Sequence, residues 1–190
     1  MLPRKGGTKM AKAPSTNATR LLKQAGIAYT EHLYRYEAPL QADEIGLGAS
    51  RTGGSQSRVR HGGTRVSARE LGVDEHAIIK TLVMEDETGS PLIILMHGDR
   101  EVSTKELARQ LGVKTVQPCK PEVAHRHSGY LVGGTSPLGT KKAMPVHAEA
   151  TIFDLERIYL NGGSRGFLVE LDPKELDKVL EIKRVNVAIP

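Results

Sequence analysis

The run Ile78-Ile79-Lys80-Thr81-Leu82-Val83-Met84 decides the fold class, together with a second apolar run at residues 91–96. Both runs are rich in aliphatic and β-branched residues, and the segment between them contains the turn-forming Gly89. This spacing predicts a hairpin of two antiparallel strands. Because helical patterns alternate with strand patterns in the rest of the chain, we expect a single α/β domain with a mixed β-sheet flanked by helices, not a purely parallel sheet.

Capping residues predict where further helices begin and end. A Ser103-Thr104-Lys105-Glu106 capping box opens a helix that Gly112 ends, and Asp172 caps a last helix that runs to residue 180. The other helices are expected at residues 16–25, 67–71 and 121–128. The other strands are expected at residues 27–36, 115–117, 130–132, 158–160 and 167–171, with a turn at 161–163 between the last two.

Two segments lack the apolar periodicity of a folded element. Residues 1–15 are basic and contain prolines and a glycine pair, so we interpret them as a disordered lead, and Met10 is an alternative start to Met1. Residues 46–64 are rich in glycine and arginine and predict a flexible surface loop, with a basic RNA-contacting flap as the alternative. The folded domain is therefore expected to span residues 16–190.

Composition excludes several classes of protein. The 190 residues are 38% hydrophobic, and no apolar run is long enough to cross a bilayer, so no membrane partner is expected. A single cysteine, Cys119, excludes an internal disulfide and indicates a reducing, cytoplasmic location. The net charge of +5 favours a polyanionic partner, and the few aromatic residues argue against binding by successive base stacking.

Lys80 is the first candidate for chemistry. Strand alternation puts it on the face shared by Ile78, Leu82 and Met84, while Thr81 shares the other face with Ile79 and Val83. A lysine in such a run either extends along an edge to reach water or enters a pocket where its ammonium meets an anion or a polarised carbonyl. An inward lysine without a protein carboxylate nearby suggests a ligand as its partner.

The segment Gly129-Tyr130-Leu131-Val132-Gly133-Gly134-Thr135-Ser136-Pro137-Leu138-Gly139 is the second candidate. Glycines let backbone N–H groups approach a ligand closely, so this segment either holds an anion or oxyanion or simply forms two tight turns. It matches neither a P-loop nor a nucleophile elbow, which makes Ser136 a poor nucleophile. Lys141 and Lys142 follow and either attract phosphates or form a solvated pair.

Other reactive residue types carry weaker signals. His125 and His127 diverge on a helix and have no ligand partner at suitable spacing, so no metal is expected. Cys119 lies beside a lysine, but no base accompanies it, so we interpret it as a bystander thiol.

The chain resembles a known family at these same positions. Residues 79–83, the glycine-rich segment with Lys141 and Lys142, Ile158-Tyr159 and Gly162-Gly163-Ser164-Arg165-Gly166 closely resemble the YbaK-type aminoacyl-tRNA deacylases, relatives of the editing domain of bacterial prolyl-tRNA synthetases. The resemblance runs in order from about residue 16 to residue 180. It implies a barrel-like mixed sheet and a crevice for the aminoacylated 3′ end of tRNA.

The resemblance also implies an activity and a site. The activity is trans-editing, the removal of a wrong amino acid, typically cysteine, from tRNA(Pro). It implies no cofactor and no DNA partner. Prolyl-tRNA synthetase is a candidate protein partner. The catalytic group implied is Lys80 with the loop formed by Gly133, Gly134, Thr135, Ser136 and Pro137. A tyrosine of the first strand belongs to the pocket, and both Tyr34 and Tyr36 fit.

Two departures from the family's pattern qualify these expectations. Leu168 stands where several relatives carry an acidic residue, so no carboxylate role transfers to it, and the loop at 46–64 looks like an insertion near the substrate side. The alternatives to a Cys-tRNA(Pro) deacylase are an enzyme that clears Ala-tRNA(Pro) and a non-catalytic module that binds tRNA or a synthetase.

Overall fold

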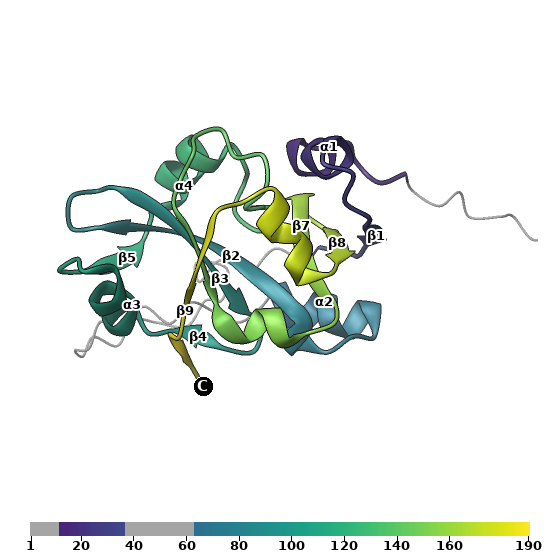
Figure 1. Cartoon of the computed structure of the whole chain (residues 1–190). Coiled ribbons are helices and arrows are strands. Elements are labelled where there is room, and N and C mark those ends of the chain that lie inside the picture. Colours follow the sequence, from purple (N-terminus) through teal and green to yellow (C-terminus); the bar gives the residue numbers. More distant parts are fainter. Residues whose placement is uncertain (1–11, 37–62) are drawn as a thin grey trace, which may run out of the picture.

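The structure is a computed structural model that describes residues 12–36 and 63–190 (Figure 1). Most of the predicted lead and of the predicted 46–64 loop lies outside these residues. The four α-helices of the described part are α1 (Asn17–Gln24), α2 (Gly63–Leu71), α3 (Thr104–Leu111) and α4 (Pro121–Ser128). Three short 3₁₀ helices accompany them: η2 (Glu75–Ala77), η3 (Ala150–Asp154) and η4 (Pro173–Lys178).

Capping chemistry sets the helix ends as the sequence predicts. Thr16 caps α1 with a reciprocal capping box, and the hydroxyl of Ser103 accepts the backbone N–H of Glu106 at the start of α3. Gly112 and Gly129 end α3 and α4 in the left-handed region, at φ values of 73° and 78°, which glycine adopts without a steric penalty.

An eight-stranded mixed sheet forms the centre of the domain, which confirms the predicted fold class. Its strands follow the order β1-β8-β7-β2-β3-β6-β9, and β5 also pairs with β2. The hairpin of β2 and β3 is antiparallel, whereas β2 runs parallel to β7 and β3 runs parallel to β6. A separate pair joins β4 (Glu101–Val102) to β10 (Ala188–Ile189). The strands of the main sheet are β1 (Thr30–Leu33), β2 (Ile78–Asp86), β3 (Pro91–His97), β5 (Val116–Pro118), β6 (Val146–Glu149), β7 (Ile158–Ser164), β8 (Phe167–Leu171) and β9 (Ile182–Val185).

The two faces of the sheet are covered differently. The main core lies on one face, where residues of β2, β3, β6, β7 and β8 pack with α1, α4, η3 and η4. On the opposite face, one cluster gathers beneath α3 around Met84, Ile94 and Met96, and a small cluster of Ala68, Ile78 and Leu168 gathers beneath α2. Lys80 lies on this second face, between the two clusters.

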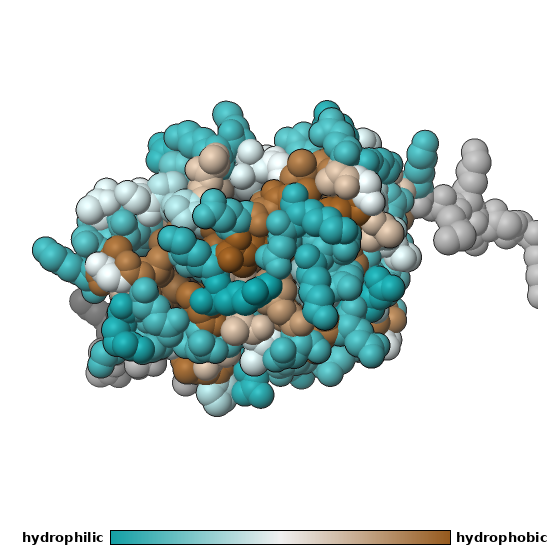
Figure 2. Space-filling model, in the orientation of Figure 1, coloured by the Kyte–Doolittle hydropathy of each residue, from teal (hydrophilic) through white to brown (hydrophobic). Residues whose placement is uncertain are grey.

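Hydrophilic residues cover most of the surface seen in the orientation of Figure 1, with apolar residues visible in a band across it (Figure 2). None of the helices in the described ranges is long and apolar enough to cross a membrane.

The expectation of a strand at residues 130–132 is wrong. Tyr130 is buried and donates its hydroxyl to the carbonyl of Leu138 at 2.7 Å, while Leu131 and Val132 are 58% and 50% exposed. The backbone N–H of Gly134 bonds back to the Leu131 carbonyl at 2.8 Å, so the chain turns here and pairs with no strand. Alternation of apolar residues alone does not reveal this turn.

Three other element predictions need correction. The turn expected at 161–163 is a bulge inside β7, and the chain reverses at Arg165 and Gly166 instead. The helix expected at 67–71 begins earlier, at Gly63, and the last helix is a 3₁₀ helix that ends at Lys178. The sequence reasoning also missed β6 and β9; β6 is buried at all four positions although it contains His147 and Glu149.

Candidate active site

Lys80 is half-buried on β2 and has a protein partner. Its ammonium donates a hydrogen bond to the backbone carbonyl of Arg100. Burial lowers the pKa of Lys80, and the carboxylates of Glu101, Glu75 and Asp99 oppose that shift. The expectation of a lysine without a protein partner is therefore wrong, because the turn after β3 and the 3₁₀ helix before β2 fold back next to the amine.

The glycine-rich segment is held to β7 and to the turn that follows it. The side-chain amide of Asn161 donates to the Gly133 carbonyl at 3.0 Å, and Arg165 Nε donates to the Val132 carbonyl at 2.9 Å. At Gly134 an added Cβ would lie 2.9 Å from the backbone N of Arg165. The segment can approach β7 this closely only because that position is glycine.

Strand register brings Lys80 to the same region. The parallel pairing of β2 with β7 aligns Ile79 with Leu160, and the next residues along the two strands are Lys80 and Asn161. Alternation then directs both side chains to the second face of the sheet. The register therefore indicates that Lys80 is a neighbour of Asn161, whose amide binds the Gly133 carbonyl.

Three backbone N–H groups of this segment have no acceptor among the described residues. Within the described residues, the amides of Gly133, Thr135 and Ser136 donate no hydrogen bond to another protein group. Unpaired donors next to a cation are the arrangement that stabilises a developing oxyanion. The segment is thus a candidate oxyanion-binding loop.

The side chains of residues 135–137 have structural surroundings. Ser136 is buried, and its hydroxyl accepts the backbone N–H of Leu138 at 3.3 Å. Thr135 donates its hydroxyl to the Leu131 carbonyl at 3.4 Å, and Pro137 is buried. These contacts fix the loop, so any catalytic contribution of these residues would come through the backbone.

Both candidate tyrosines lie just after β1, which spans Thr30–Leu33 and not residues 27–36 as expected, and their surroundings differ. Tyr34 packs against the cluster of Ile78 and Leu168, and burial raises the pKa of its phenol. The ring of Tyr36 lies against Gly133, where an added Cβ would be 2.5 Å from the Tyr36 hydroxyl, and the guanidinium of Arg165 lies 5.3 Å from the ring centroid. Tyr36 thus supports the loop directly.

Lys141 and Lys142 are exposed at the other end of the glycine-rich segment. Their backbone N–H groups bond to the carbonyls of Ser128 and His127, each at 3.0 Å, which fixes them beside the C-terminal end of α4. Their predicted role in substrate binding stays a prediction.

Cys119 is far from a reactive state. Burial, together with the nearby Glu85 carboxylate, raises the pKa of its thiol to about 11, and the thiol lies 3.7 Å from that carboxylate. A thiol of this kind is protonated at neutral pH. Among the described residues, no group of three or more His, Cys, Asp or Glu side chains could hold a metal ion.

Sequence reasoning missed several polar residues on the second face of the sheet. Asn161 was assigned only to a turn and Arg165 only to a motif of the resemblance, although both hold the glycine-rich segment. His32 on β1 pairs with Glu170 on β8 at 2.7 Å, and the ring of His32 contacts that of Tyr159. Leu168 itself is buried in the apolar cluster, so the carboxylate on this face of β8 is Glu170. The alternation of β8 after Leu168 could have identified it.

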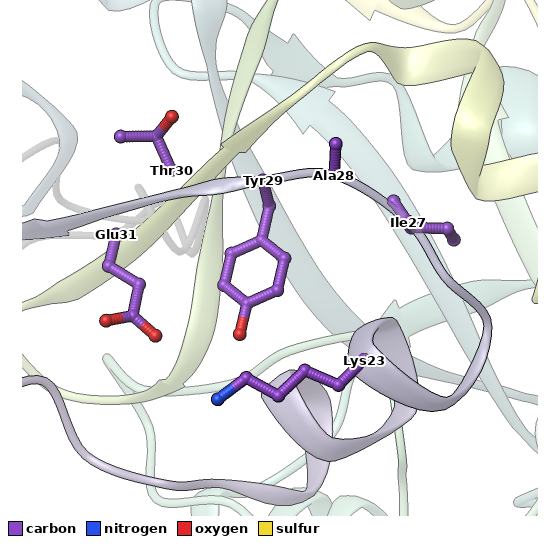
Figure 3. Close-up of a pocket in the computed structure, with 6 residues that line it drawn as sticks. All are labelled: Lys23, Ile27, Ala28, Tyr29, Thr30 and Glu31. Atoms are coloured by element: carbon purple, nitrogen blue, oxygen red, sulfur yellow. The ribbon is translucent and has the colours of Figure 1, made fainter.

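A hollow in the described surface lies between α1 and β1. It has a volume of about 540 Å³ and is lined by Lys23 and by residues 27–31, between α1 and β1. Figure 3 shows the ring of Tyr29 extending towards Lys23, with Glu31 to one side. It contains none of the predicted site residues and is widely open to solvent, so we do not assign the chemistry to it.

Comparisons with known proteins bear on the family and the fold of the chain. A family model described as an aminoacyl-tRNA editing domain matches residues 63–179, more than half of the chain. The chain is 27% identical over 162 residues to the "Putative Cys-tRNA(Pro)/Cys-tRNA(Cys) deacylase EbsC" of Enterococcus faecalis, a match that covers 85% of each protein. It is 25% identical over 105 residues to a proline–tRNA ligase of Limosilactobacillus fermentum, covering 53% of this chain and 18% of the ligase.

Solved structures share the fold. The crystal structure of "a putative trans-editing enzyme for prolyl tRNA synthetase" has a TM-score of 0.68 at 20% identity, and the match covers 94% of this chain and all of that one. The crystal structure of the hypothetical protein APE2540 has a TM-score of 0.69 at 19% identity, covering 92% of this chain and all of that one. At these identities the likeness concerns the fold alone.

Proposed function

The chain belongs to the aminoacyl-tRNA editing domain family, and from that premise we propose that it is a trans-editing deacylase that removes a mischarged amino acid from tRNA(Pro). The family implies a deacylase that takes aminoacyl-tRNA as its substrate. One observation of this chain carries the proposal. Lys80, half-buried on β2, and Asn161, whose amide binds the Gly133 carbonyl, directly follow the paired residues Ile79 and Leu160 of adjacent parallel strands.

This arrangement suits the cleavage of an aminoacyl ester. The ester links the amino acid to a ribose hydroxyl of the terminal adenosine and is already activated, so the protein needs mainly to hold it and to stabilise the tetrahedral oxyanion. Water attacks the carbonyl carbon, the bond to the ribose oxygen breaks, and that oxygen takes up a proton as it leaves. The ammonium of Lys80 and the loop amides supply donors for the oxyanion, so no protein nucleophile is needed.

Cysteine is the mischarged amino acid that we propose. The relative from Enterococcus faecalis carries a name that states a Cys-tRNA(Pro) and Cys-tRNA(Cys) deacylase, and it covers most of this chain. A cysteine substrate also brings its own thiol, which can attack its carbonyl in place of water; the reaction would then be a lyase reaction. Alanine on tRNA(Pro) is the competing substrate. Either function belongs to the cytoplasm. The binding partner is the 3′ end of tRNA, and prolyl-tRNA synthetase is a candidate protein partner.

Release of labelled amino acid tests the proposal. Purified protein in excess is mixed with Cys-tRNA(Pro), Ala-tRNA(Pro) or Pro-tRNA(Pro), and the remaining ester is followed with time. We expect rapid loss of the cysteinyl ester, slower loss of the alanyl ester and a stable prolyl ester. Preference for the alanyl ester would make alanine, not cysteine, the amino acid removed. No turnover by the unmutated protein, together with tRNA binding that survives Lys80→Ala, would indicate a non-catalytic module.

A further inference from the structure

A polar cluster holds the turn that follows β3, next to Lys80. His76 Nδ1 lies 2.8 Å from Asp99 Oδ1, and the rings of His76 and His97 stack with centroids 3.7 Å apart and an interplanar angle of 11°. His76 and Asp99 are each about one-third exposed, whereas His97 is fully buried. The cluster therefore extends from the surface to the buried His97, which pairs across the β2–β3 hairpin with Ile79, the residue before Lys80.

His97 anchors the cluster in the interior. Its Nδ1 lies 2.7 Å from the His76 carbonyl, which can only accept, so Nδ1 carries the proton. Its Nε2 then accepts the hydroxyl of Thr151 on η3 at 2.9 Å. Because burial lowers the pKa of His97, the ring stays neutral and provides a fixed platform for His76.

The backbone of the turn is fixed on both sides. The N–H of Arg100 donates to the His97 carbonyl at 3.2 Å, and a Cβ added at Gly98 would lie 2.5 Å from the Glu75 carbonyl oxygen. Asp99, between these two residues, is held by His76. The carbonyl at the end of this turn, on Arg100, is the one that accepts the ammonium of Lys80.

We propose that His76 and Asp99 are positioning residues, which hold the turn at residues 98–100 so that the Arg100 carbonyl fixes the Lys80 ammonium. The consequence for catalysis rests on the proposed function; the effect on the lysine itself does not. Neither residue has a contact with the glycine-rich segment, so each acts through the turn and through Lys80.

The charges around Lys80 define what a variant should change. Carboxylates face it from three segments, namely Glu75 of η2, Asp99 of the turn and Glu101 of β4, and all three raise the pKa of its amine against the effect of burial. His76 lies next to Asp99, and the Arg100 guanidinium is 3.6 Å from the same carboxylate. Asp99→Asn therefore removes one of three negative charges while keeping the shape of the side chain.

Two measurements on a set of variants test the proposal. The first is the pH dependence of Lys80 acetylation by acetic anhydride, followed by mass spectrometry of the Lys80 peptide, which needs no enzymatic activity. The second is the rate of single-turnover deacylation measured over a range of protein concentrations. It gives the maximal rate and the protein concentration at half-saturation. His76→Phe keeps a ring to stack on His97 but has no donor, whereas His76→Asn keeps a donor near the position of Nδ1. Asp177→Asn is the matched control, because Asp177 forms an exposed ion pair with Arg184 at the same 2.8 Å.

We expect Asp99→Asn to make Lys80 react several-fold faster near neutral pH, because its amine loses its proton more readily. Asp99→Asn and His76→Phe should each lower the maximal deacylation rate about tenfold with little change in half-saturation, since a displacement of about 1 Å in a catalytic group costs up to about 10². His76→Asn should recover most of that rate, and Asp177→Asn should match the unmutated protein. Unchanged acetylation of Lys80 in Asp99→Asn overturns the proposal, and so does a rate in His76→Phe equal to that of the control. If no tRNA is deacylated by any form of the protein, the proposed function fails, and acetylation alone decides on the positioning role.

Discussion

Gly133→Ala tests whether the glycine-rich loop is packed as the structure shows. Gly133 has φ of +86°, and a Cβ there would lie 2.5 Å from the hydroxyl and 2.9 Å from two ring carbons of Tyr36. The substitution therefore adds two costs. One is the steric penalty of a left-handed backbone in a residue with a Cβ, and the other is the displacement of the Tyr36 ring.

The size of each cost can be separated with a matched glycine. The left-handed conformation costs about 1–2 kcal/mol per residue, and overpacking costs typically about 1–3 kcal/mol. Gly89 has a similar φ of +79°, but a Cβ there meets nothing within 4 Å. We therefore expect Gly89→Ala to lower the free energy of unfolding by about 1–2 kcal/mol and Gly133→Ala to lower it by about 2–5 kcal/mol.

Denaturant unfolding of a double-mutant cycle supplies the measurement. In a Tyr36→Ala background the space beside Gly133 is free, so Gly133→Ala should cost only the backbone part, the same as Gly89→Ala. Deacylation should also fall in Gly133→Ala, because the loop amides move with the ring. Equal losses for Gly133→Ala and Gly89→Ala in the unmutated background, with no coupling to Tyr36, would refute this account of the loop.

Three further predictions concern charge and reactivity. Because burial lowers the pKa of Lys80, the unfolded chain keeps a proton on this amine at pH values where the folded chain has released it. The unmutated protein should thus gain stability relative to Lys80→Met as pH rises towards the amine's usual pKa of 10.5. A difference in free energy of unfolding between the two proteins that stays constant with pH would contradict this. With a thiol pKa of about 11, Cys119 should react with iodoacetamide at neutral pH on the order of 100-fold more slowly than a free cysteine, and Cys119→Ser should keep full deacylation activity. Replacing both Lys141 and Lys142 with alanine should reduce the slope of log affinity for tRNA against log salt by about 1.5, and an unchanged slope would exclude both from phosphate contact.

The strands and helices with strong local signals could be predicted from the sequence. The hairpin of β2 and β3 follows from two uninterrupted aliphatic runs, and the ends of α3 and α4 follow from a capping hydroxyl and from glycine. The strand prediction for residues 130–132 failed because these residues have the composition of a strand. In the structure the buried hydroxyl of Tyr130 bonds to the Leu138 carbonyl, and the chain turns here. The strand β6, which lies between β3 and β9, was missed because its histidine and glutamate conceal a buried strand.

The site could be predicted in its residue types but not in its connections. Lys80 and the glycine-rich segment stand out by composition, and strand alternation gives the direction of the lysine. The proposal that they act together depends on β2 running parallel to β7, a pairing between residues about 80 positions apart that no local pattern contains. The Arg100 carbonyl lies only 20 positions from Lys80, but it was missed because no sequence pattern shows that the turn after β3 folds back to the amine.

A single-turnover comparison tests the central claim most directly. The rate of ester loss from Cys-tRNA(Pro) is measured with excess unmutated protein and, in parallel, with Lys80→Met and with Lys174→Met, which removes an exposed amine on η4. We expect the unmutated protein and Lys174→Met to clear the ester at the same rate and Lys80→Met to be slower by about 10² to 10³, the loss typical of one preorganised oxyanion donor. Equal rates for all three proteins, or an ester that decays no faster than in buffer, would contradict the account.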